Sequence, residues 1–138
     1  MKNPYSKLNT LKEINPTGLS QASEGEMPQY LKKNPSHKVL NVGSGNTGLV
    51  DNRIVHMDIF RYEVIDLVAD ASHLPFPDRS FDAVFCDAVL EHVKNPFQVV
   101  GEFSRVLKEA GYVSVGVPFL SPYHDVPDHY FNFSSSGI

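Results

Sequence analysis

A short strand-like run that leads straight into a glycine-rich turn is the feature that most limits the fold of this chain. The run Lys38–Val42 is largely apolar, and Gly43, Gly45 and Gly48 follow it directly. Short runs of this kind, bounded by glycine, are typical of buried parallel strands. In an open parallel sheet, ligands bind beyond the carboxyl ends of such strands. The pattern therefore predicts an α/β protein with a ligand site above the glycines.

Four further runs have the same character, because each is short and bounded by glycine, proline or aspartate. They are Arg53–Ile59, Val64–Ala69, Asp82–Cys86 and Tyr112–Val117. We expect them to form one mostly parallel sheet with the first run.

The strongest helical pattern is Pro96–Lys108, between the fourth and fifth strands, with Gly111 as a stop signal. Its apolar residues recur at helical spacing, which predicts one buried face. That face comprises Phe97, Val100, Phe103, Val106 and Leu107. A shorter helix is expected to open at Asp87–His92.

The first two connections are too short for the usual crossover helices. Residues 43–53 have room for little more than a turn, and residues 60–63 have room for none, whereas a parallel crossover normally needs about a dozen residues. One face of the sheet is therefore expected to be thinly covered. The polar, proline-containing residues 1–37 are the available cover, with helix-like spacing in Tyr5–Ile14 and around Tyr30–Lys33. We thus divide the chain into a lead-in, residues 1–37, and a ligand-binding domain, residues 38–138.

Composition restricts the partners. The 138 residues carry a formal net charge of -4 and lack a basic stripe, which disfavours nucleic acid. No apolar run approaches the length of a membrane span, and Cys86 is the only cysteine. These observations predict a soluble, cytoplasmic protein. Cys86 is interpreted as a small buried hydrophobic residue rather than a nucleophile.

The glycine turn has two interpretations. Gly43, Gly45 and Gly48 satisfy the dinucleotide pattern G-x-G-x-x-G, which would indicate a nicotinamide-dependent oxidoreductase. That pattern requires a helix after the glycines and an acidic residue about 20 positions later. Residues 49–53 cannot supply the helix, and Asp58 comes too early. The oxidoreductase interpretation is therefore the weaker one.

Two later segments indicate a different cofactor. Residues 70–84 read DASHLPFPDRSFDAV, and residues 89–93 read VLEHV with Asn95 and Pro96 behind them. Together with the glycine turn, this ordered series resembles the class I S-adenosylmethionine-dependent methyltransferases of the small-molecule type. The resemblance covers about residues 38–133. It implies a Rossmann-like sheet in the order 3-2-1-4-5 and methylation of a small-molecule acceptor. Relative to that fold, the chain reads as truncated, with shortened crossovers.

The resemblance also implies a set of cofactor-binding residues. Gly43 and Gly45 would let the backbone pass under the methionine moiety, where free N–H groups could meet its carboxylate. Asp58 would hold the ribose hydroxyls, and Asp70 would accept from the adenine amino group. The full set implied for S-adenosylmethionine is Asn41, Gly43, Ser44, Gly45, Asp58, Ile59, Asp70, Ala71, Cys86, Asp87 and Ala88. Asp78 and Asp82, by contrast, are expected to cap turns.

Asn41 departs from the family pattern, which usually has an acidic residue at this position. A charged hydrogen bond contributes roughly 1.5–3 kcal/mol, against about 1 kcal/mol for a neutral one. Weaker cofactor binding would follow. A methyltransferase-like domain that binds the cofactor without catalysis is therefore the main alternative.

The segment after the fifth strand, residues 118–131, is the expected wall of the substrate site. Its His124 is the candidate general base. A metal site built from His124, Asp125, Asp128 and His129 is the alternative, but these residues lack an established ligand spacing, so no metal is predicted. His92, on the preceding helix, reads equally well as a structural or a substrate-facing residue. The sequence stops where the family normally continues through a helix and two strands, so the chain is either a fragment or a minimal version of the fold. In a minimal version the fifth strand would be an exposed edge, which predicts a homodimer.

Overall fold

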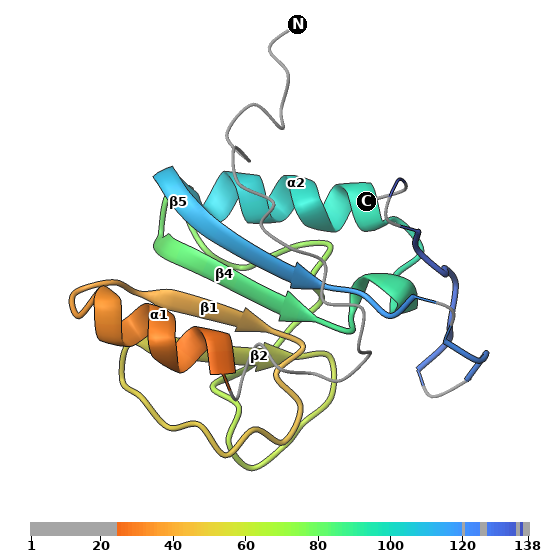
Figure 1. Cartoon of the computed structure of the whole chain (residues 1–138), viewed down its shortest axis with the longest axis horizontal. Helices are drawn as coiled ribbons and strands as arrows, with labels where there is room; N and C mark the ends of the chain where they lie inside the picture. The colour runs from red at the N-terminus through yellow and green to blue at the C-terminus, as the bar shows by residue number, and fades with distance from the viewer. Residues whose placement is uncertain (1–24, 120, 125–126, 135, 137–138) are drawn as a thin grey trace, which may run out of the picture.

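A five-stranded parallel sheet with one helix on each face makes up the core of the molecule (Figure 1). The computed structural model describes residues 25–119, 121–124, 127–134 and 136. The sheet order is β3-β2-β1-β4-β5, with every neighbouring pair parallel. The Rossmann-like fold and its strand order are thus confirmed.

The strands are β1 Val39–Val42, β2 Ile54–Asp58, β3 Leu67–Val68, β4 Phe81–Asp87 and β5 Leu107–Gly116. The helices are α1 Met27–Lys33, the 3-10 helix η2 Leu90–His92, and α2 Pro96–Val106.

Helix α2 covers one face of the sheet. It begins at Pro96, and the side chain of Asn95 accepts a hydrogen bond from the Gln98 amide at 3.2 Å. Val99 and Phe103 are fully buried in the larger core cluster, against Leu40 and Val84 of the sheet. The interior of the domain therefore lies mainly between α2 and the sheet.

The predicted buried face of this helix is partly wrong. Phe97 is 70% exposed, and Val99 takes the inward position two residues later. The helix also ends at Val106, because Leu107 already adopts an extended conformation with ψ 138°. Leu107 pairs with Phe81 as the first residue of β5, so Gly111 lies within a strand rather than stopping a helix.

Helix α1 covers the opposite face. Met27 and Leu31 are buried against Val39, Ile54 and Phe85 in a second core cluster. The expected helix around Tyr30–Lys33 is therefore present, and this part of residues 1–37 packs on the sheet. The helical spacing at Tyr5–Ile14 lies outside the described residues, and the division at residue 37 stays a prediction.

The connections after β1, β2 and β3 contain no helix in the described structure, so the predicted trimming of the first two crossovers is confirmed. Strand β3 is shorter than the expected run Val64–Ala69. One cause is Asp66, whose carboxylate accepts the amide of His56 at 2.8 Å and so replaces a backbone partner. Each of these connections leaves its strand at the carboxyl edge of the sheet. None of the helices in the described part of the chain is long and apolar enough to cross a bilayer.

Candidate functional site

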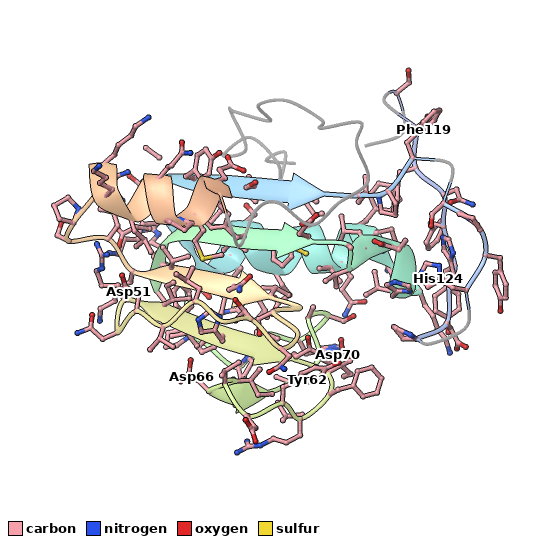
Figure 2. The ribbon with its side chains drawn as sticks, turned by 60° about the horizontal axis from the view of Figure 1, so that its bottom comes forward. Asp51, Tyr62, Asp66, Asp70, Phe119 and His124 are labelled. Atoms are coloured by element: carbon pink, nitrogen blue, oxygen red, sulfur yellow. The ribbon has the colours of Figure 1, made fainter. Side chains whose placement is uncertain are left out.

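A cavity of about 780 Å³ opens at the carboxyl edge of the sheet. Residues from the loops after β1, β2, β3 and β4 line it, together with the segment that follows β5. In Figure 2, Tyr62 and Asp70 lie along this edge with His124 to their right, whereas Asp51 lies at the opposite edge. The lining residues are Val42, Gly43, Met57–Phe60, Tyr62, Ala69–His73, Ala88, Val89, His92–Asn95, Gln98, Pro127 and Tyr130.

The glycine turn closes the inner end of this cavity. Gly43 and Gly45 have φ values of +68° and +55°, a region that glycine adopts without a steric penalty. The amides of Gly43 and Ser44 donate to the Met57 carbonyl at 2.9 and 3.1 Å, and the Gly45 amide donates to Asp58 Oδ2 at 2.9 Å. The expectation of free N–H groups here is therefore wrong, because the turn folds back onto β2.

Glycine is required at residue 43 for a second reason. A Cβ at Gly43 would overlap the side chain of Val89, the residue that leads into η2. At Gly45 the space for a Cβ is open, so only the backbone conformation favours glycine there. The turn at Gly43 is thus packed against the loop after β4, which brings two walls of the cavity together.

Asp58 ends β2 and links two loops. Its carboxylate accepts the Gly45 amide at 2.9 Å and the Phe60 amide at 3.0 Å, and the residue is only 8% exposed. An ionised carboxylate has about four acceptor positions, so these two bonds leave capacity for ligand hydroxyls. Asp58 lines the cavity, as a ribose-binding carboxylate must.

The outer wall combines one carboxylate with apolar side chains. Asp70 accepts the Ser72 amide at 2.8 Å, which fixes the turn after β3, and it borders the cavity beside Ala71. Ile59 and Phe60 also border the cavity, yet they are 54% and 47% exposed. Exposed apolar side chains beside a carboxylate are suited to a flat heteroaromatic ring with a hydrogen-bonding edge.

The end of β4 contains backbone strain. Ala88 has φ +53°, although it carries a Cβ, and its amide donates to the Gly116 carbonyl at 2.9 Å. Asp87 Oδ2 is buried without a hydrogen-bond partner among the described residues. Strain and an unsatisfied carboxylate oxygen tend to occur together at functional sites. Ala88 lines the cavity, and Asp87 precedes it.

Several predicted residues do not line this cavity: Asn41, Ser44, Gly45, Cys86 and Asp87. Cys86 is fully buried in the α2-side core, and burial raises the pKa of its thiol, which keeps it protonated. Asn41 points to the α1 side, where its Nδ2 lies 3.1 Å from His56 Nδ1. Burial lowers the pKa of His56, so this pair is neutral.

Three histidines gather where the segment after β5 meets η2. His92 and His124 approach through their Nε2 atoms at 3.1 Å, and the His129 ring lies 4.5 Å from that of His124. The amides of Tyr130 and Phe131 donate to the Glu91 carbonyl at 2.7 and 3.2 Å. These backbone bonds hold the segment beside the cavity, which Pro127 and Tyr130 of the expected wall, residues 118–131, line.

Of these histidines, His92 lines the cavity and His124 does not. His124 is exposed and reaches the cavity only through His92. Among the described residues, no group of three or more His, Cys, Asp or Glu side chains is arranged to hold a metal ion; Asp125 lies outside them. Sequence reasoning did not assign Tyr62, Lys94 or Gln98 to the site, because no motif marks them. His73 lies within the motif of residues 70–84 and Tyr130 within the expected substrate wall, but neither was singled out.

Asp78 and Asp82 make structural contacts, but these are not the turn caps that were expected. Asp78 Oδ1 pairs with Arg105 at 3.0 Å, and Asp82 accepts the Lys38 amide at 2.8 Å. Neither residue lines the cavity.

Comparison with known proteins identifies the family. Residues 24–115, more than half of the chain, match the family model described as a methyltransferase domain. The chain belongs to this family. The resemblance to class I S-adenosylmethionine-dependent methyltransferases is thereby confirmed.

This chain aligns with only part of the length of its curated relatives. The 27-O-demethylrifamycin SV methyltransferase of Amycolatopsis mediterranei is 37% identical over 73 residues, which cover 53% of this chain and 23% of that protein. The ubiquinone/menaquinone biosynthesis C-methyltransferase UbiE of Coxiella burnetii is 33% identical over 95 residues, which cover 67% of this chain and 35% of UbiE. The chain thus spans roughly a third or less of these two relatives.

Solved structures share the fold. The YcgJ protein of Bacillus subtilis superposes with a TM-score of 0.63 at 22% identity, covering 84% of this chain and 64% of YcgJ. A putative methyltransferase from Bacillus halodurans superposes with a TM-score of 0.53 at 25% identity, covering 74% of this chain and 55% of that protein.

Proposed function

We propose that this methyltransferase domain binds S-adenosylmethionine in the cavity at the carboxyl edge and transfers its methyl group to a small-molecule acceptor. One observation carries the proposal. The positive-φ glycine turn, Asp58 and Asp70 all border one cavity of about 780 Å³, in the order along the sheet that the family motifs imply. That volume falls within the usual range for pockets that hold small molecules and cofactors.

The residues present fit this cofactor. Asp58 would accept the ribose hydroxyls with the lone pairs that its two backbone bonds leave open. Asp70 would accept the adenine amino group, with Ile59 against the ring and Ala71 beside it. Asp87, which directly precedes the cavity-lining Ala88, would stabilise positive charge, because its Oδ2 has no hydrogen-bond partner among the described residues.

The predicted residues away from the cavity wall would act indirectly. Ser44 and Gly45 would hold the turn on β2 through their backbone amides. Cys86 would fill the core below the site. Asn41 would support the sheet through its contact with His56 rather than contact the cofactor ammonium.

Methyl transfer requires little covalent chemistry from the protein. When bound, the cofactor supplies a methyl group activated on a sulfonium sulfur. The chain would position the acceptor and exclude water, with the apolar side chains of the cavity and the wall at Pro127 and Tyr130. His124 would serve as general base for an acidic acceptor.

The small-molecule acceptor is supported by the setting of the cavity. Apolar side chains such as Met57, Val89 and Val93 line it, and the formal net charge is -4. The two curated relatives are named as methyltransferases of a rifamycin and of quinone biosynthesis. A cytoplasmic location and a homodimer paired along β5 remain part of the proposal. Light scattering that finds only a monomer would refute the dimer.

A domain that binds the cofactor without catalysis is the second candidate. The contact of Asn41 with His56 favours it, because this neutral pair supplies no charge toward the cavity. The nicotinamide-dependent alternative loses support, since residues 43–53 contain no helix that could hold a pyrophosphate.

Calorimetric titration with S-adenosylmethionine and S-adenosylhomocysteine tests the proposal. Micromolar binding of either is expected. A folded chain that binds neither compound would refute it. Binding without methyl transfer to any acceptor in a broad screen of small hydroxyl and amine compounds would favour the non-catalytic candidate.

A further inference from the structure

Two ring nitrogens, His92 Nε2 and His124 Nε2, face each other at 3.1 Å beside the cavity. Their other nitrogens determine what lies between them. His92 Nδ1 lies 3.0 Å from the Asp128 carbonyl oxygen, and His124 Nδ1 lies 3.1 Å from the Pro122 carbonyl oxygen. A carbonyl oxygen only accepts hydrogen bonds, so each Nδ1 must carry a proton.

This assignment leaves no proton for the contact between the rings. A neutral imidazole has one N–H, and both histidines use theirs on a carbonyl. Two lone pairs would then oppose each other at 3.1 Å, which is repulsive. One added proton turns the contact into a hydrogen bond, whereas a second would place two N–H groups head to head. The geometry therefore fits a pair that holds one extra proton.

Backbone hydrogen bonds hold the segment that carries Asp128, the partner of His92 Nδ1, against η2. Residues 127–131 are held on η2 by the bonds of the Tyr130 and Phe131 amides to the Glu91 carbonyl. His92 has a side chain only 12% exposed and borders the cavity, while His124 lies on the solvent side. The two Nε2 atoms therefore meet where His92 borders the cavity, and they can hold one proton between them.

The surrounding groups allow this position to bear a positive charge. On η2 itself, Glu91 Oε1 lies 3.8 Å from His92 Nε2, although burial raises the pKa of this carboxyl. From the segment after β5, the His129 ring faces both histidines and is stacked by Tyr123. Further out, the Tyr130 hydroxyl donates to Asp128 at 2.8 Å, and Lys94 Nζ lies 6.0 Å from the Tyr130 ring.

We propose that His92 and His124 act together as the general base of this site, with His92 as the member that touches the acceptor. The proposal rests on the proposed methyltransferase function and specifies its acceptor as a hydroxyl compound. The acceptor oxygen forms the new bond to the methyl carbon, and the electron pair of the breaking carbon–sulfur bond stays on sulfur. The hydroxyl proton passes to His92 Nε2, is shared with His124 Nε2, and later leaves to water.

Imidazole NMR of the full-length, nitrogen-15-labelled chain tests the shared proton across roughly pH 5 to 8. Both rings are expected to keep their Nδ1 protons and to lose one proton in a single common step. In His124→Asn, whose side-chain amide can still donate to the Pro122 carbonyl, His92 should lose its proton independently of residue 124. An Nδ1 without its proton, or two independent losses in the wild-type chain, would overturn the proposal.

Phenol, added to the chain saturated with S-adenosylhomocysteine, tests the contact with the acceptor. It should perturb the His92 Nε2 signal, and His92→Asn should weaken phenol binding roughly tenfold, a loss of about 1.4 kcal/mol. His37→Gln is the matched control, because His37 precedes β1, contacts Tyr30 and does not line the cavity, and it should bind phenol as the wild type does. Unperturbed His92 would overturn this inference alone, whereas failure to bind S-adenosylhomocysteine would overturn the proposed function.

Discussion

The two edges of the sheet differ in how far their polar groups are satisfied by hydrogen bonds. At the amino edge, Arg53 pairs with Asp51 at 2.5 Å and donates to the carbonyls of Leu31 and Pro35. At the carboxyl edge, Ser44 Oγ, Asp87 Oδ2 and Glu91 Oε2 are buried without hydrogen-bond partners among the described residues. Figure 2 shows this separation, with Asp51 at one edge and Asp70 and His124 at the other.

Backbone conformation adds to the difference. The positive-φ residues Gly43, Gly45 and Ala88 lie at the carboxyl edge, beside the cavity. Positive φ also occurs at Arg79, in the loop before β4, and at Ala110, near the start of β5, and neither residue borders the cavity. Unsatisfied groups and strain raise the free energy of the folded chain. Their concentration at the carboxyl edge, where the cavity opens, supports the proposed ligand site there.

Gly43→Val gives the largest expected effect, because it changes both the backbone and the cavity. The valine would be strained at φ +68°, and its side chain would overlap Val89. We expect no measurable binding of S-adenosylhomocysteine by calorimetry and a loss of about 2–4 kcal/mol in the free energy of unfolding. Gly48→Val is the control, since a Cβ at Gly48 meets nothing within 4 Å. Equal binding by the two variants would contradict this assignment.

Asp58→Ala should damage the ligand edge more than the fold. It removes the acceptor for the Gly45 and Phe60 amides and for the proposed ribose hydroxyls. Affinity for S-adenosylmethionine should fall by about 1–3 kcal/mol, or roughly 5- to 150-fold. The affinity of Asp58→Asn should lie between those of Asp58→Ala and the wild type, because asparagine keeps one oxygen acceptor. Unchanged affinity in both would mean that the cofactor binds elsewhere.

Asp82→Asn tests the opposite edge. The Asp82 carboxylate accepts the Lys38 amide at 2.8 Å and Lys108 Nζ at 2.8 and 2.9 Å. Burial alone would raise its pKa, but the bonds from Lys108 and Lys38 lower it overall. We expect a loss of about 1 kcal/mol in unfolding free energy, with unchanged affinity for S-adenosylhomocysteine.

The sign of the pH effect follows from that direction. Because the folded pKa of Asp82 is below its unfolded value, its contribution is complete above about pH 4 and disappears as the pH falls toward the folded value. The unfolding free energies of the wild type and Asp82→Asn should therefore approach each other as the pH falls below about 4 and coincide once it is below the folded pKa of Asp82. A difference that persists there would mean that the charge of Asp82 is not what stabilises this edge.

The sequence predicted the sheet well because burial determines its pattern. Runs such as Lys38–Val42 are short and apolar, and glycine or aspartate ends them, so strand identity and order followed from local composition and family motifs. The motifs also located Gly43, Asp58 and Asp70, all of which border the cavity. These positions depend on residues that are close in sequence.

What the sequence did not predict depends on contacts between distant residues. Phe97 fits the apolar period of α2 but is exposed, because the sheet faces Val99 instead. The amides of the glycine turn were expected to be free, yet the Met57 carbonyl satisfies two of them from the neighbouring strand. The approach of His124 to His92 likewise joins residues 32 positions apart, which no local pattern reveals.

Ala88→Gly gives the smallest expected effect and tests strain at the ligand edge directly. At φ +53° an alanine is less favourable than a glycine by roughly 1–2 kcal/mol, whereas glycine loses about 0.5–1 kcal/mol through its greater freedom in the unfolded chain. The free energy of unfolding of the variant, measured by urea denaturation, should therefore be about 0.5 kcal/mol higher than that of the wild type. The free energy of unfolding of Ala110→Gly, at φ +58° near the other edge, should increase by a similar amount. The two variants should differ in ligand binding alone, because only Ala88 borders the cavity. If Ala88→Gly is more stable but binds S-adenosylhomocysteine less tightly, the strain at this edge serves the ligand rather than the fold.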